Sequence, residues 1–148
     1  AGWWGHKESE RFQMKKGFIP EPGAAGWQLS NAPVLAMAAH KASLDMFDEV
    51  GMDALVAKGK LLNTFLEHVV MDAQASNDKL EFEIISPAER GCQLSMLTNE
   101  NGKALFDYLT ERDVIADWRQ PNVIRLAPVP MYNSFMDVWE FGELLKGF

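Results

Sequence analysis

The chain has 148 residues, 47% of them hydrophobic and 24% charged, a composition typical of a globular protein with a sizeable core. Its formal net charge of −7 argues against nucleic acid as a partner, because phosphate binding requires a basic surface. No apolar run approaches the ~20 residues of a membrane span, and Cys92 is the single cysteine, which excludes an internal disulfide and a CxxC site. We therefore expect a cytoplasmic protein.

Residues 1–30 alternate glycines and prolines with aromatic side chains, which predicts a loop-rich but packed segment and no long helix. The chain opens AGWWGH, without Met, and two tryptophans so close to a free terminus are unusual. We therefore expect residue 1 to be a cut within a larger protein, part of which packs on this segment.

Two helices are expected next. Residues 33–50 carry apolar side chains at spacings of three and four, with Ser30 and Asn31 just before them as candidate N-caps. Gly51 interrupts the pattern, and a longer amphipathic helix is predicted over 52–73.

From residue 80 the pattern changes to short strands and helices. Alternating or β-branched segments predict strands over 80–86, 91–98, 114–118 and 123–127. Helices are predicted over 102–112 and 134–145, the second with Ser134 as its cap, and Cys92 is expected inside a strand as a small core residue. The order β-β-α-β-β-α indicates an α/β fold class, with a small antiparallel or mixed sheet and helices on one face.

Few residues suggest chemistry by themselves. His6, His40 and His68 have no metal-site spacing, and neither a phosphate loop nor a GxSxG motif is present. A helix start at Ser30 and Asn31 could bind a phosphate, although the local sequence favours a plain cap.

Arg125 is the strongest local signal. It lies between Ile124 and Leu126 in a predicted strand, so its guanidinium is expected to need an anionic partner. The planar guanidinium suits a carboxylate, and the residues leave a ligand carboxylate and an internal acid equally open. Trp3 and Trp4 could likewise line an aromatic pocket, with core packing as the favoured alternative.

Four blocks, taken in order, resemble the C-terminal part of the kynureninases. They are AGWWGHKESERFQM, GWQLSNAPVLAMAAHKASLDMF, ERGCQLS and DWRQPNVIRLAPVPMYNSF. The resemblance extends over this chain from residue 1 to residue 148. Kynureninases are homodimeric, pyridoxal-5'-phosphate-dependent hydrolases of fold type I, the aspartate-aminotransferase-like fold. They act in tryptophan catabolism and convert L-kynurenine or 3-hydroxykynurenine to anthranilate or 3-hydroxyanthranilate and L-alanine.

The resemblance implies a domain organisation. Residues 1–50 would be the tail of the large cofactor domain, 51–79 a connecting helix and 80–148 the small C-terminal α/β domain. Other fold-type I enzymes, such as a desulfurase or an aminotransferase, are alternatives against which the SNAP and YNSF blocks argue. A non-catalytic α/β module that binds an acidic effector through Arg125 is a further alternative.

The resemblance also implies roles for five residues. Trp3 and Asn31 would contact the cofactor, Trp4 and Ser30 would lie near the aromatic ring of the substrate, and Arg125 would bind its α-carboxylate. The Schiff-base Lys, the Asp partner of the pyridinium and the Tyr acid of the family are expected upstream. The chain alone is therefore expected to contain no catalytic residue and to be inactive.

Overall fold

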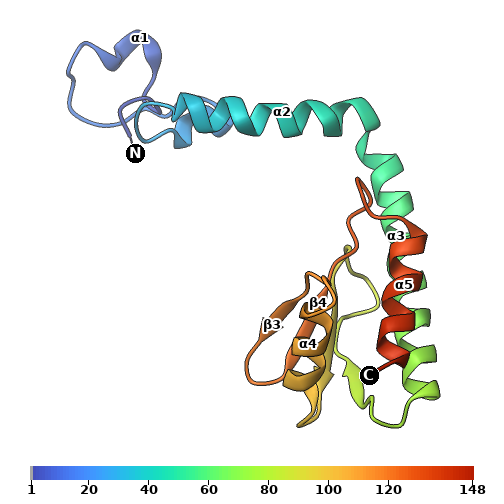
Figure 1. Ribbon diagram of the computed structural model, residues 1–148. Coiled ribbons are helices and arrows are strands. Elements are labelled where there is room, and N and C mark those ends of the chain that lie inside the picture. The colour runs from blue at the N-terminus through green and yellow to red at the C-terminus, as the bar shows by residue number, and fades with distance from the viewer. Residues whose placement is uncertain (1) are drawn as a thin grey trace. The chain divides into compact units, whose positions relative to one another are not determined.

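The computed structural model describes residues 2–148, which form two compact units (Figure 1). The first unit runs to Glu49 and the second covers Val50–Phe148. The expectation of a cut before Ala1 concerns a residue outside the described range. Within residues 2–148, no helix is both long enough and apolar enough to cross a membrane.

The first unit has little regular structure before its long helix, as its glycine content predicts. Its helical segments are α1 (Glu8–Arg11), η1 (Gly23–Trp27) and α2 (Val34–Val50). Two backbone hydrogen bonds of 2.8 Å join the ends of the segment that contains α1. They run from the amide of Lys7 to the carbonyl oxygen of Ile19 and from the amide of Glu21 to the carbonyl oxygen of Gly5. Gly5 is required here, because a Cβ at this position would lie 2.4 Å from the carbonyl oxygen of Gly26.

Helix α2 confirms the helix predicted over 33–50, but none of its side chains is buried in the described structure. Leu35 is 88% exposed and Met46 is 54% exposed. The apolar stripe along α2 is therefore not part of a core formed by residues 2–148.

The second unit confirms the predicted order of elements after residue 80. Its elements are α3 (Met52–Ser76), β1 (Phe82–Ile84), β2 (Leu94–Thr98), α4 (Gly102–Thr110), β3 (Asp117–Arg119), β4 (Val123–Leu126) and α5 (Phe135–Lys146). Two expectations need correction. The strand predicted over 114–118 begins only at Asp117, and Cys92 precedes β2 and is partly exposed, so it is not a core residue within a strand.

The strands of this unit form an antiparallel sheet in the order β1-β2-β4-β3. In β4, Ile124 and Leu126 are buried, whereas Arg125 between them points to the opposite face, because side chains alternate along a strand. The register pairs Arg125 with Ser95 of β2 on one side and with Asp117 of β3 on the other.

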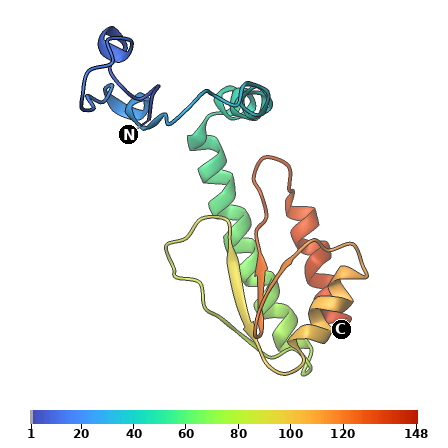
Figure 2. The same cartoon turned by 90° about the vertical axis from the view of Figure 1, so that its left-hand side faces the viewer.

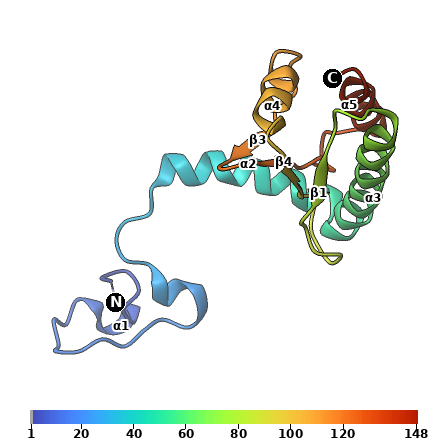
Figure 3. The ribbon, with the colours of Figure 1, turned by 90° about the horizontal axis from the view of Figure 1, so that it is seen from below.

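Helices α3, α4 and α5 cover the buried face of the sheet (Figures 2 and 3). Side chains from all three helices and from β1, β2 and β4 meet in one core, whose fully buried members include Leu62, Val70, Leu94, Met96, Leu109, Ile124 and Leu145. The other face of the sheet carries Ser95 and Arg125 together with the partly buried Leu97 and Val123.

Candidate functional site

Trp4 and Asn31, two of the predicted site residues, contact one another in the first unit. The indole Nε1 of Trp4 donates a hydrogen bond of 2.5 Å to Oδ1 of Asn31, across 27 positions of sequence. Trp3 is 43% exposed and Trp4 is 36% exposed. Core packing, which the local sequence favoured for both tryptophans, is therefore wrong within the described structure.

Ser30 and Asn31 are not the N-cap of α2. The helix begins at Val34, and its first backbone hydrogen bond runs from Met37 to the carbonyl oxygen of Pro33 at 2.9 Å. Pro33 explains the difference, because a residue that precedes proline is disfavoured in the helical conformation. The phosphate site built on a cap at Ser30 and Asn31 is therefore not formed by the helix start, and Oδ1 of Asn31 binds the indole of Trp4 instead.

Arg11 fixes the segment that carries the two tryptophans, a role that the sequence did not reveal. Its side chain is buried, and its Nη2 donates hydrogen bonds of 3.0 Å to the carbonyl oxygens of Trp4 and His6. The guanidinium also lies 4.8 Å from the centre of the Trp4 ring, within the range of a cation–π contact. Polar neighbours in the sequence ESERFQ gave no sign that this arginine would be buried.

Arg125 pairs with an internal acid in the second unit. Its Nε donates a hydrogen bond to Oδ2 of Asp117, and its Nη2 forms an ion pair with the same oxygen. The side chain remains 31% exposed. Of the two anions that the sequence left open, the structure thus contains the internal one.

Asp117 lies between two arginines. Arg119 donates from Nε to the same Oδ2 of Asp117 at 2.9 Å, and the three side chains together carry a formal charge of +1. Burial raises the pKa of Asp117, but hydrogen bonds from Arg125 and Arg119 outweigh this effect and leave the pKa below its ordinary value. The carboxylate is therefore ionised at neutral pH.

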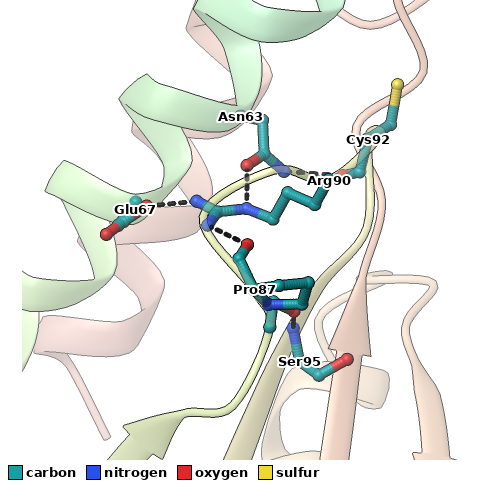
Figure 4. A network of polar contacts seen from close by, with 7 residues as sticks. Asn63, Glu67, Pro87, Arg90, Cys92 and Ser95 are labelled. Atoms are coloured by element: carbon teal, nitrogen blue, oxygen red, sulfur yellow. Dashed lines mark hydrogen bonds and ion pairs between the residues drawn. The ribbon is translucent and has the colours of Figure 1, made fainter.

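A second polar network fastens the segment before β2 to helix α3 (Figure 4). Arg90 donates to Oδ1 of Asn63, to the carboxylate of Glu67 and, at 3.0 Å, to the carbonyl oxygen of Pro87. Asn63 in turn donates to the carbonyl oxygen of Cys92 at 2.8 Å. The ERGCQLS block suggested no role for Arg90, because its partners lie on a distant helix.

This network leads directly into the strand beside Arg125. The amide of Ser95 donates to the hydroxyl of Ser86 at 2.8 Å, and Nε2 of Gln93 donates to the hydroxyl of Ser95 at 3.1 Å. Ser95 is the β2 partner of Arg125, so these hydrogen bonds end at the strand that lies beside the arginine. Within residues 2–148, no cluster of three or more His, Cys, Asp or Glu side chains could hold a metal ion.

Comparisons with known proteins agree on one family. The family described as "Kynureninase C-terminal domain" matches residues 55–145. Among curated proteins, the kynureninase of Christiangramia forsetii is 54% identical over 148 residues, which cover 98% of this chain and 35% of that protein. The kynureninases of Flavobacterium johnsoniae and Xanthomonas campestris pv. campestris are 50% and 48% identical, over 99% and 97% of the chain. The chain spans about a third of the length of these relatives.

Proposed function

This chain belongs to the kynureninase family, and we propose that it forms the C-terminal part of an enzyme that hydrolyses L-kynurenine or 3-hydroxykynurenine. The products would be anthranilate or 3-hydroxyanthranilate and L-alanine, as part of tryptophan catabolism and of the supply of precursors for NAD. The observation that carries the proposal is the identity of 54% over 98% of the chain, which extends through both structural units. The match also disfavours a desulfurase, an aminotransferase or a non-catalytic module.

The proposed organisation assigns residues 1–50 to a large cofactor domain, 51–79 to a connecting helix and 80–148 to a small α/β domain. It supposes that α2, which has no buried side chain here, packs on that large domain. We further propose that the complete enzyme is a cytoplasmic homodimer, with neither nucleic acid nor membrane as a partner. Sedimentation of the full-length enzyme measures its oligomeric state.

The donor groups of the first unit fit pyridoxal 5'-phosphate. Within residues 2–148, the indole Nε1 of Trp3, the side-chain nitrogen of Asn31 and the hydroxyl of Ser30 have no hydrogen-bond partner, and all three residues are exposed. A phosphate group accepts hydrogen bonds from such donors. Trp3 and Asn31 would hold the cofactor, which supplies an electron sink for the amino acid bound to it.

The remaining site residues would bind and orient the substrate. Arg125 would bind the α-carboxylate, and Trp4 and Ser30 would lie beside the aromatic ring. The bond from Trp4 to Asn31 orients the amide of Asn31, so that its nitrogen is the group left to donate. The Lys, Asp and Tyr that perform catalysis in the family are proposed to lie in the part of the enzyme that precedes this chain.

Steady-state kinetics of the full-length enzyme tests this assignment. Arg125→Lys is expected to raise the KM for L-kynurenine at least about tenfold, because lysine cannot form two parallel hydrogen bonds with a carboxylate. Cofactor binding, followed by its absorbance, is expected to stay intact. Arg112→Lys is the matched control, since Arg112 stacks on Tyr108 at the end of α4 and is expected to leave KM unchanged.

The separate chain supplies the second test. Incubated with pyridoxal 5'-phosphate and L-kynurenine, it is expected to release no fluorescent anthranilate. Turnover by the chain alone would contradict the proposed location of the catalytic residues, and an unchanged KM for Arg125→Lys would contradict the proposed role of Arg125.

A further inference from the structure

We propose that Asp117 is a positioning and specificity-determining residue, which holds one edge of the Arg125 guanidinium and limits the site to a ligand with one carboxylate at this end. The inference rests on the proposed role of Arg125 as the residue that binds the substrate carboxylate. It assigns new roles to Asp117 and to its second partner, Arg119.

The contacts of Arg125 leave one of the two carboxylate-binding edges of its guanidinium free. A guanidinium can bind carboxylates through its Nε–Nη2 edge or through its Nη1–Nη2 edge. Asp117 occupies the first edge, since both Nε and Nη2 of Arg125 contact its Oδ2. No residue within 2–148 binds Nη1, and the side chain is 31% exposed. An internal acid and a ligand carboxylate can therefore bind Arg125 together.

Strand register places Asp117 beside Arg125, where it can hold the guanidinium. Asp117 of β3 stands directly opposite Arg125 of β4, and directly opposite side chains in an antiparallel pair are close neighbours. Arg119 follows two positions later on the same face and donates to the same Oδ2 of Asp117. Asp117 is thus held by Arg119 while it holds Arg125, and this restrains the aspartate side chain.

The charges explain the selectivity. Arg119, Asp117 and Arg125 carry a formal charge of +1, which one ligand carboxylate neutralises. A second ligand carboxylate would enter a site that is already neutral and would be repelled by Asp117. Without the charge of Asp117, the formal charge of the remaining side chains rises to +2, which favours a dianionic ligand. Without the charge of Arg119, the formal charge falls to zero, which disfavours a dianionic ligand.

Inhibition of the full-length enzyme by a matched pair of anions tests this proposal. Butyrate and succinate have the same chain length and differ by one carboxylate. In Asp117→Asn, the ratio of the Ki of butyrate to the Ki of succinate is expected to rise about tenfold. In Arg119→Gln the same ratio is expected to fall. Asp117→Glu, which keeps the charge, is expected to stay near the wild-type ratio.

Positioning gives a separate kinetic readout. Asp117→Asn is expected to raise the KM for L-kynurenine about tenfold with kcat within about twofold, because Arg125 loses a charged hydrogen-bond partner. Asp107→Asn is the control, since Asp107 pairs with Lys103 on the exposed face of α4. Circular dichroism of every variant verifies folding.

The outcomes separate this inference from the proposed function. An unchanged Ki ratio in both Asp117→Asn and Arg119→Gln, or an equal loss of affinity for both anions, would overturn the role of Asp117 even where Arg125→Lys raises KM. If Arg125→Lys itself leaves KM unchanged, the proposed function of Arg125 fails, and the inference fails with it.

Discussion

Ser134 and Asp137 show how single side chains begin an element of this fold. The amide of Asp137 donates to the hydroxyl of Ser134 at 3.2 Å, and the amide of Ser134 donates to the carboxylate of Asp137 at 2.9 Å. This capping box satisfies two amides that helix α5 leaves unpaired. The backbone hydrogen bond from Ser134, together with side-chain hydrogen bonds from Asn133 and Ser134, lowers the pKa of Asp137 below its ordinary value of 3.8.

The lowered pKa predicts a pH-dependent loss of stability in Asp137→Asn. A carboxyl whose pKa is lower in the folded state stabilises the fold above its unfolded pKa, and this contribution disappears as pH falls through the folded value. The variant is therefore expected to melt at a lower temperature than the wild type at neutral pH, and the difference is expected to shrink below pH 3.8. Thermal unfolding across this range measures it, with Asp107→Asn as a control. A difference that stays constant with pH would show that the carboxylate charge has no role in the cap.

At the scale of elements, the second unit is held together by close packing of α3 on α5. Gly142 of α5 lies against Val69 of α3, and a Cβ at Gly142 would lie 2.2 Å from Cγ1 of Val69. Real contacts between carbon atoms are much longer than this, so the two helices approach closely only because Gly142 has no side chain. The glycine in the middle of α5 thus serves packing, at the expense of helix propensity.

Gly142→Ala is expected to destabilise the chain by about 1–3 kcal/mol, although alanine favours a helix over glycine by about 1 kcal/mol. Val69→Ala should relieve the overlap, so the double variant is expected to lose less stability than the two single losses added together. Urea denaturation measures the free energies of unfolding. Gly91→Ala is the control, because no atom lies within 4 Å of a Cβ at that position. Simple additivity of the two substitutions would contradict this packing argument.

At the scale of the whole chain, the two units differ in how much they bury. The second unit has a continuous core that joins its sheet to three helices. In the first unit the described side chains bury little, with Arg11 as its buried charged residue and no buried side chain in α2. Local opening costs least free energy where few apolar contacts are lost, so the first unit should open first.

Limited proteolysis of the separate chain is therefore expected to cut before Val50 first and to leave a resistant fragment that contains α3 to α5. This fragment is expected to unfold in one cooperative transition, with the same midpoint as the second unit in the intact chain. Mass spectrometry of the fragments and thermal unfolding measure both outcomes. Early cleavage inside α3 or the sheet would show that the second unit does not fold independently.

Much of the fold could be predicted from sequence because its signals are local. Apolar spacing predicted α2 and α3, and alternation predicted the order of strands and helices after residue 80. Ser134 was identified as a cap because capping depends on residues within one turn. Local signals failed at Ser30 and Asn31, which lie too far before Val34 to cap α2, and at Cys92, which precedes its strand.

By itself, the sequence determined the elements, their order and, through whole blocks of residues, the family. Only the tertiary structure decided which groups meet. Asp117 is one of 21 acidic residues, and strand register alone selects it as the partner of Arg125. Trp4 reaches Asn31, and Arg90 reaches Asn63 and Glu67, across more than 20 positions of sequence. The physical reason is that spacing along the chain determines which face a side chain occupies, whereas its partner depends on how distant segments pack.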